Sequence, residues 1–217
     1  VGCIADHGDL FIFGENTTEP WPNTADGFQR SPNAYIETGT SAAATIVKLD
    51  NSLYWLGLDA RGFGIVWRMN GYNPVRVSNH AVETAIQNYP TTSDAIGYSF
   101  QLEGHSFYVL TFPTADRTWL HDVSTNQWYE WLWRDPDLNT LHRHRSNCHV
   151  VFNEEHLVGD WQTGNVYALD MDNYTDNNVP ILRQRTTQTL QKEQRYQFFS
   201  SLQVDMQTGV GITSGQG

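Results

Sequence analysis

A short aromatic-rich run recurs four times along this chain of 217 residues. The copies are DLFIFG (9–14), SLYWLG (52–57), SFYVLT (106–111) and EEHLVG (154–159), and their last residues are 43, 54 and 48 positions apart. Each run predicts a β-strand, and each lies in a stretch with room for about three more strands. A repeat of about 40 to 50 residues with about four strands per unit is typical of a β-propeller blade. We therefore expect an all-β fold, a β-propeller built of four-stranded antiparallel blades with one short helix.

The expected blades cover about 1–35, 45–78, 95–133 and 148–187, and a further unit begins at 196–211. Together they are expected to form a single β-propeller domain over 1–217. A ring closed by four blades of this length would be small, and the chain begins at Val1 without a methionine. We therefore expect an incomplete segment of a longer protein.

The second blade has the clearest pattern. Strands are predicted at 45–49, 53–57, 65–69 and 74–77, separated by short turn sequences. In the first blade, residues 15–30 contain Pro20 and Pro22 and are predicted to form a long loop with turns. In the fourth blade, 179–185 is predicted to supply the fourth strand.

Two local devices are also predicted. Ser78 or Asn79 can cap a helix of about ten residues, with an apolar stripe that includes Val82 and Ile86, before Pro90 stops it. Asp122, Thr125 and Trp128 follow the spacing Asp-x-x-Thr-x-x-Trp. In this spacing the Asp and Thr build a side-chain-bonded turn, and the Trp re-enters the sheet as an anchor.

Charge and composition limit the classes of function. The chain has 13 basic and 24 acidic residues, a net charge of −11, which disfavours a general nucleic-acid binder because the phosphate backbone is also negative. No apolar stretch approaches eighteen residues, so no membrane span is expected. The two cysteines, Cys3 and Cys148, are too few for a disulfide framework and are expected to be buried or half-buried thiols.

Metal-ligating residue types are crowded at one place only. His142, His144, Cys148 and His149 could contribute to a zinc site, but their spacing fits no established finger, and a polar connector is the alternative. Asp170, Asp172 and Asp176 could supply oxygen ligands to calcium, but they also fit a solvated turn that ends a strand. We therefore expect no metal and no other cofactor.

Paired carboxylates could cleave a glycosidic bond. The candidates are Asp59, Asp116, Asp122, Asp135, Asp137, Glu154 and Glu155. Residues 116–119 also partly match a sialidase Asp-box, with Arg117 at the glycine position. Trp131, Trp133 and Tyr72 could stack on sugar rings, or could serve blade packing and subunit contacts. No residue is singled out as catalytic, cofactor-binding or nucleic-acid-binding.

Several strings in order resemble the packaged-DNA stabilization proteins, or tail hub proteins, of short-tailed phages (podoviruses). They are FIFGENTTEPW (11–21), LYWLGLDARG (53–62), RVSNHAVETAI (76–86), EGHSFYVLTFP (103–113), TWLHD (118–122), LVGDWQTGNVYALD (157–170) and DMQTGVG (205–211). The resemblance covers nearly the whole chain and implies a β-propeller subunit with a structural role, not an enzyme. Members of the family are longer on both sides of this span.

The resemblance implies a place in the virion, within the phage tail, for a protein made in the cytoplasm of the bacterial host. The hub lies below the portal and its adaptor ring as a homo-oligomer, a ring that is typically a hexamer. It extends the DNA channel, helps retain packaged DNA, and anchors tailspikes or a tail plug or needle. DNA is expected to pass without specific binding, because each phosphate contact with Lys or Arg would slow it, and the only lysines are Lys48 and Lys192.

Two other functions stay open from the residues alone. A carbohydrate-binding or glycoside-cleaving propeller requires two convergent carboxylates beside exposed Trp or Tyr. A generic protein-interaction propeller would bind a cellular partner instead of assembling on a portal.

Overall fold

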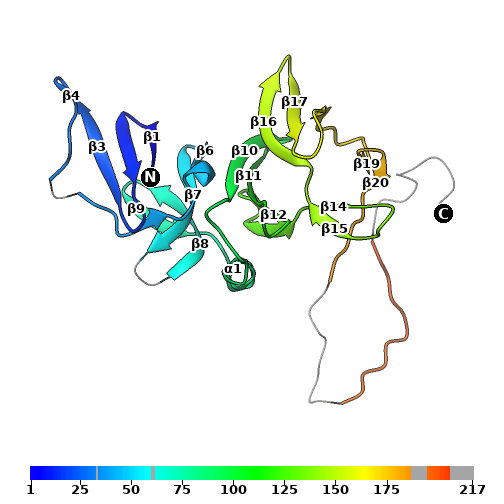
Figure 1. The fold of residues 1–217 in the computed structure, drawn as a ribbon. Coiled ribbons are helices and arrows are strands. Elements are labelled where there is room, and N and C mark those ends of the chain that lie inside the picture. Colours follow the sequence, from blue (N-terminus) through cyan, green and yellow to red (C-terminus); the bar gives the residue numbers. More distant parts are fainter. Residues whose placement is uncertain (33, 60–61, 187–194, 206–217) are drawn as a thin grey trace. The chain divides into compact units, whose positions relative to one another are not determined.

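The computed structural model of the chain describes residues 1–32, 34–59, 62–186 and 195–205 (Figure 1). Two compact units are present, one of residues 1–133 with 141–169 and a smaller one of residues 134–140 with those from 170 on. The larger unit holds antiparallel meanders of strands that follow one another in sequence. The single domain expected over 1–217 stays a prediction.

Three meanders match the first three expected blades. The first sheet consists of β1 (Gly2–Asp6), β2 (Asp9–Phe13), β3 (Thr18–Thr24) and β4 (Gly27–Phe28). The second consists of β5 (Gly39–Thr40), β6 (Val47–Leu49), β7 (Ser52–Asp59), β8 (Gly62–Asn70) and β9 (Asn73–Arg76), and a 3-10 turn, η1 (Ala43–Thr45), precedes β6. The third consists of β10 (Ile96–Leu102), β11 (His105–Phe112), β12 (Arg117–Asp122) and β13 (Gln127–Glu130).

The remaining strands form shorter sheets. A pair, β14 (Leu132–Arg134) and β15 (Leu141–Arg143), is followed by a three-stranded sheet of β16 (Ser146–Phe152), β17 (Glu155–Asp160) and β18 (Val166–Ala168). In the smaller unit, β19 (Thr175–Asp176) pairs with β20 (Val179–Pro180).

Tight hairpins join the leading strands of each meander. Among the described residues, five two-residue hairpin loops have positive φ at both positions: His7–Gly8, Asp50–Asn51, Glu103–Gly104, Asn153–Glu154 and Asn177–Asn178. A two-residue loop with both φ values positive is the type I′ turn, whose twist matches that of the flanking strands. Asn, Asp and Gly tolerate this conformation best, which explains their frequency at these positions.

The recurring run is the strand that follows this turn, and its side chains form the core. In the second sheet it is β7, whose residues from Ser52 to Gly57 are all buried. Trp55 of β7 makes an edge contact with Phe13 of β2 at a ring distance of 5.3 Å, whereas the adjacent Tyr54 lies 5.6 Å from Tyr108 of β11. Because neighbouring residues of a strand point to opposite faces, β7 is covered by the first sheet on one face and the third on the other.

The edge strands also contact one another. Strand β10 packs against β6 and against β16. Ser99 Oγ donates to the carbonyl oxygen of Lys48 at 2.8 Å, and the hydroxyls of Tyr98 and Ser146 share a hydrogen bond of 2.5 Å. Strands β6, β10 and β16, which border three different sheets, therefore adjoin within the larger unit.

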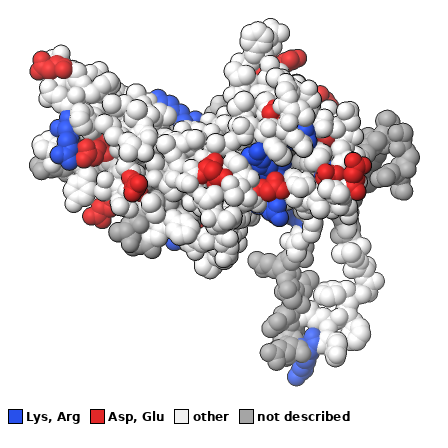
Figure 2. Space-filling view, in the orientation of Figure 1, with Lys and Arg blue, Asp and Glu red and all other residues white. Residues whose placement is uncertain are grey.

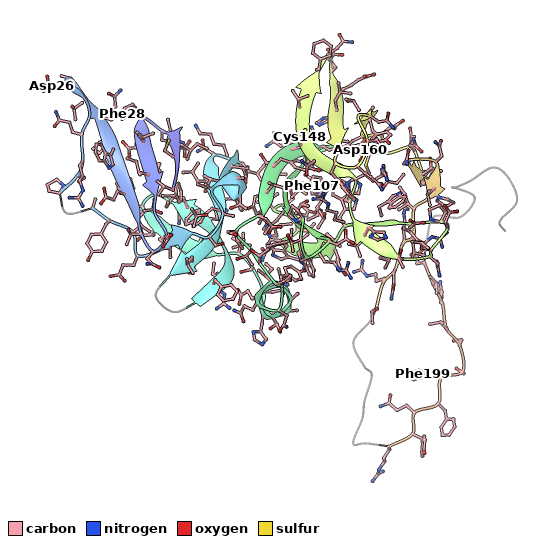
Figure 3. The ribbon with its side chains drawn as sticks, in the orientation of Figure 1. Asp26, Phe28, Phe107, Cys148, Asp160 and Phe199 are labelled. Atoms are coloured by element: carbon pink, nitrogen blue, oxygen red, sulfur yellow. The ribbon has the colours of Figure 1, made fainter. Side chains whose placement is uncertain are left out.

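The predicted loop at 15–30 is wrong, because most of it forms β3 and β4. The N–H of Asn23 donates to Gly8, so Asn23, Trp21 and Glu19 present their backbone groups to β2. Pro20 and Pro22 alternate with them and face away from β2, where a missing N–H breaks no bond of that ladder. Asp26 and Phe28 lie at the tip of this hairpin (Figure 3).

The fourth strand predicted at 179–185 also differs from the structure. Residues 179–180 pair with Thr175–Asp176 across the Asn177–Asn178 turn, because a type I′ loop pairs the residues on its two sides. Residues 181–186 lie in no strand. Of the further unit at 196–211, residues 196–205 have no regular secondary structure, Phe199 among them (Figure 3), and 206–211 lie outside the described residues.

The helix α1 (His80–Gln87) forms where it was predicted, with Asn79 as its cap. The Asn79 side chain accepts from the N–H of Val82 at 3.0 Å, and Val82 and Ile86 are buried as expected. The helix also buries Glu83, which the apolar stripe did not predict. Its carboxylate accepts from Arg76 and from Ser78 Oγ, the latter at 2.6 Å, so the buried charge is paired.

Candidate functional site

The candidate carboxylates serve local structure wherever the structure shows their bonds. Asp116 accepts from the backbone N–H of Arg143 at 2.9 Å and lies 2.6 Å from His142 Nδ1, which ties the start of β12 to β15. Asp135 accepts from the N–H groups of Asp137 and Leu138 in a turn. Glu154 and Glu155 are exposed at the β16–β17 hairpin. Asp59 ends β7, and its side chain lies outside the described residues.

The crowded metal-ligand types do not share one site. His142 lies beside Asp116, whereas His144 is buried and lies 2.6 Å from Ser146 Oγ. His149 pairs with His156, a residue that was not among the candidates. Among the described residues no three or more His, Cys, Asp or Glu side chains gather in a way that could hold a metal ion.

The expectation that the cysteines are buried or half-buried is wrong, because Cys3 and Cys148 are both exposed free thiols. Each lies on the first strand of its sheet, which borders that sheet: Cys3 on β1 and Cys148, labelled in Figure 3, on β16. Asp170, by contrast, behaves as the solvated turn expected of it and accepts from the N–H of Asp172 at 2.9 Å.

Tryptophans line the segment from His142 to Arg145, which begins in β15 and leads into β16. The His144 ring stacks on Trp131 at a centroid distance of 3.6 Å, and the Arg145 guanidinium lies 4.8 Å above Trp133. Trp131 and Trp133 therefore pack inside the fold. Tyr72 is half exposed, and its hydroxyl donates to Asp9.

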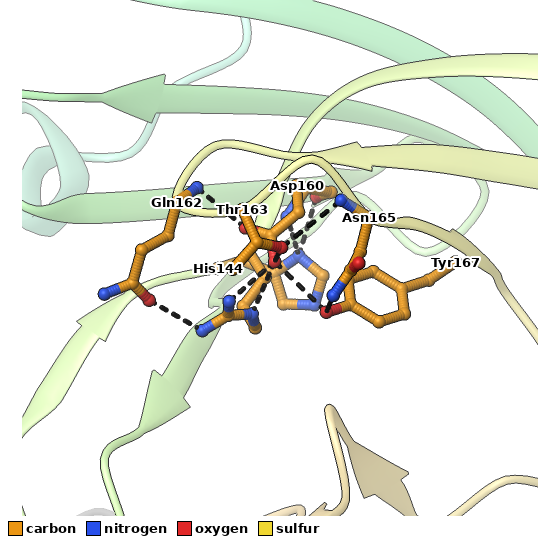
Figure 4. Close-up of polar contacts among 8 residues, drawn as sticks. His144, Asp160, Gln162, Thr163, Asn165 and Tyr167 are labelled. Carbon is orange, nitrogen blue, oxygen red and sulfur yellow. Dashed lines mark hydrogen bonds and ion pairs between the residues drawn. The ribbon is translucent and has the colours of Figure 1, made fainter.

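An ion pair between Arg145 and Asp160 lies at the centre of this region (Figure 4). Arg145 Nε and Nη2 donate to one carboxylate oxygen of Asp160 at 3.0 and 2.6 Å, and the side chains are only 3% and 0% exposed. The same oxygen accepts from the hydroxyls of Thr163 and Tyr167 at 2.8 and 3.1 Å. Gln162 completes the network, since its N–H donates to the other Asp160 oxygen and its side-chain oxygen accepts from Arg145.

This network sets the charge of its members. The pKa of Asp160 is lowered to about 2, because the hydrogen bonds from Gln162, Thr163 and Arg145 outweigh the opposing effect of burial. The pKa of His144 is lowered to about 3, chiefly by burial and then by the adjacent Arg145 charge. At neutral pH the site therefore holds a paired cation and anion beside an uncharged imidazole.

The Asp160 turn repeats a device that the sequence showed once. Asp122 accepts from the N–H of Ser124 at 2.9 Å and from Thr125 Oγ1 at 2.7 Å, as predicted. Trp128 anchors this turn, because its ring stacks on His121 and its Nε1 donates to the carbonyl of Val77. Asp160 and Thr163 form a second copy with the same Asp-x-x-Thr spacing. This copy was not predicted, and the spacing is its only signal in the sequence.

The chemistry of this region is structural. The Arg145 charge is compensated by Asp160, and the dashed lines in Figure 4 join Asp160 to Thr163, Tyr167 and Gln162 as well. The network connects the residues before β16 to the turn after β17. It thereby fixes the register of the three-stranded sheet.

Comparisons with known proteins agree with this architecture. A family model described as "Bacteriophage P22 Gp10, beta-propeller" matches residues 1–174. No curated protein matches the chain. Among the described residues, no helix is both long and apolar enough to cross a membrane.

Proposed function

Because this chain belongs to the bacteriophage P22 Gp10 β-propeller family, we propose that it is a subunit of the tail hub of a short-tailed phage. The family match over residues 1–174 carries this proposal. The chain is a phage structural protein with a β-propeller fold. Its finer role, as proposed here, is to extend the DNA channel below the portal and to help retain the packaged genome.

The proposed assembly is a homo-oligomeric ring, a hexamer, in the virion tail. On one side it contacts the adaptor of the portal, and on the other it anchors tailspikes and a plug or needle. The protein is not an enzyme in this proposal, and its propeller serves as a scaffold for these contacts.

Ion pairs between basic and acidic side chains support the passage of DNA without binding. Arg145 is committed to Asp160, Arg76 to Glu83 and Arg30 to Glu19. Lys48 and Arg117 likewise lie 3.2 Å from Asp6 and Glu130. On the face shown in Figure 2, basic side chains appear in small groups, and some of these groups lie beside acidic side chains. Affinity for DNA grows with the number of phosphates that Lys and Arg neutralise, so compensated cations favour free sliding.

The position in the virion can be tested by electron cryomicroscopy of the intact phage. We expect density for this chain in a ring coaxial with the portal and below the adaptor. Particles assembled without the protein should fill with DNA and then lose it, which a nuclease-protection assay measures. Density elsewhere in the virion, or full retention of DNA without the protein, would contradict the proposal.

Passage without binding has a separate test. A gel-shift titration of the isolated chain with duplex DNA at low salt should show no retarded complex. A basic DNA-binding protein of similar size serves as the positive control. Tight binding would overturn the proposal that DNA passes without binding and would leave the hub assignment standing. Hydrolysis of a glycan by the chain would favour the carbohydrate alternative.

A further inference from the structure

Two histidines on adjacent strands of the β16–β18 sheet face each other. Nε2 of His149 and Nδ1 of His156 share a hydrogen bond of 3.0 Å, and the rings lie 5.2 Å apart at an interplanar angle of 28°. His149 pairs with Val158 in the β-ladder, and His156 pairs with Val151. The two histidines are therefore diagonal neighbours on one face of the hairpin, within reach of each other.

The surroundings of this pair hold the rings in place and leave them accessible. His149 lies 6.1 Å from Tyr98 and 5.4 Å from Phe100, both on β10, and His156 meets Phe100 edge-on at 6.3 Å. Both histidines are nevertheless only partly buried. The packed aromatic side restricts the rings, and the other side is open to a small ion.

Two imidazole nitrogens at this separation match the geometry of neighbouring ligands on a transition metal. With metal–nitrogen distances of about 2.1 Å and angles between 90° and 109°, two ligand nitrogens lie about 3.0 to 3.4 Å apart. Neutral imidazole is the ligand that Zn²⁺, Ni²⁺ and Cu²⁺ prefer.

We propose that His149 and His156 form a two-histidine site for a divalent late transition ion such as Zn²⁺ or Ni²⁺. The ring that donates the present hydrogen bond shifts its proton to its other nitrogen, so both facing nitrogens present lone pairs and no net proton is released. Since no cluster of three or more ligand side chains exists among the described residues, water fills the remaining positions. Cys148 is not a ligand, because its sulfur lies over Gly159 and neighbouring strand residues face opposite sides.

Metal at this site would crosslink β16 to β17 where both lie against β10. The metal would stabilise the pairing of these two strands in a three-stranded sheet, which has one strand fewer than the sheet of β10–β13. The site is independent of the proposed hub function.

The test is calorimetric titration of the chain, produced without a polyhistidine tag, with ZnCl₂ and separately with NiCl₂. We expect one saturable equivalent, and a loss of affinity of about tenfold or more in His149→Gln and in His156→Gln, because each removes one of two ligands. His80→Gln is the matched control, since it removes an exposed histidine at the start of α1 and should leave binding unchanged. Unchanged binding in both pair variants, or no saturable binding at all, would overturn the site.

A measurement on the unaltered chain covers the case in which a variant does not fold. Side-chain NMR of the eight histidines, recorded during a Zn²⁺ titration, should show two imidazoles that shift together. The variants identify the two signals where they fold. Shifts confined to other histidines, or no shifts, would refute the proposal.

Discussion

The guanidinium of Arg145 and the carboxylate of Asp160 meet where solvent does not reach either side chain. Removing water from two charges is costly, and their attraction offsets this cost only when the geometry is good and the remaining polar atoms are bonded. Thr163, Tyr167 and Gln162 provide those bonds. The pair is therefore stabilising only as a complete network.

Breaking one partner of this pair should strongly destabilise the protein. Arg145→Met or Asp160→Asn leaves an unpaired buried group, and we expect the free energy of unfolding to fall by about 3 to 5 kcal/mol. Urea denaturation measures the change. The matched control is Arg30→Met, which breaks the solvent-exposed pair with Glu19 and should leave the stability nearly unchanged. An equal, small effect of both substitutions would contradict the importance of the buried network.

The stability should also fall as the pH decreases through the range of His144. Its pKa is about 6.5 in the unfolded chain and about 3 in the folded protein. Between these values the unfolded chain binds a proton that the folded protein does not, so the free energy of unfolding decreases by up to about 1.4 kcal/mol per pH unit as the pH falls. His144→Asn should flatten this slope between pH 6 and 4, as measured by denaturant titration at each pH, whereas His80→Gln should leave it unchanged. A slope that His144→Asn does not alter would show that another group is responsible.

Loss of the hydroxyl group should have different effects on the free energy of unfolding at two buried tyrosines that are in contact. Tyr108 Oη donates to the carbonyl of Thr45 at 2.9 Å, whereas the hydroxyl of Tyr54 is buried without a hydrogen-bond partner among the described residues. Tyr108→Phe should therefore lower the free energy of unfolding by about 1 kcal/mol, and Tyr54→Phe should leave it unchanged or raise it. Thermal denaturation of the two variants, side by side, provides the measurement. A loss of stability in Tyr54→Phe as large as in Tyr108→Phe would contradict this reasoning.

The last residue of the second recurring run must be glycine. A methyl group at Gly57 would overlap Cδ1 and Nε1 of the Trp67 indole, which packs over it from β8. Gly57→Ala should therefore cost about 1 to 3 kcal/mol through overpacking. Gly164→Ala is the control, because nothing lies within 4 Å of the added methyl group. Chemical denaturation of both variants tests the prediction, and equal stabilities would contradict it.

The sequence was sufficient to predict the repeated strands because they depend on local pattern. Runs such as SLYWLG are apolar on both faces, and the structure buries them between sheets through the contacts of Trp55 with Phe13 and of Tyr54 with Tyr108. The Asn79 cap and the Asp122 turn were equally local. The strand at Pro20 and Pro22 was not predicted, because a strand tolerates proline only where the missing N–H faces away from its partner. Which side of this strand bonds to β2 is a property of the sheet and not of the local sequence.

The sites were less predictable for a related reason. The crowded set of His142, His144, Cys148 and His149 left a zinc site or a polar connector open in the sequence. In the structure each of its histidines has a different partner, which is Asp116 for His142, Ser146 for His144 and His156 for His149. Arg145 and Asp160 are fifteen positions apart, and only the return of β17 beside β16 brings them together. Whether a charged side chain is buried depends on such strand pairings, so the spacing of residues in the sequence did not predict the buried ion pair.

The five tight hairpins have a consequence for biosynthesis. Each is closed by two residues, so its strands can begin to pair within a few residues of emerging from the ribosome. Later sheets then pack against sheets that have already formed, and few strand edges stay unpaired until distant partners are synthesised. A β-rich phage structural protein gains from this order of folding, because aggregation competes least with chains that fold as they are made.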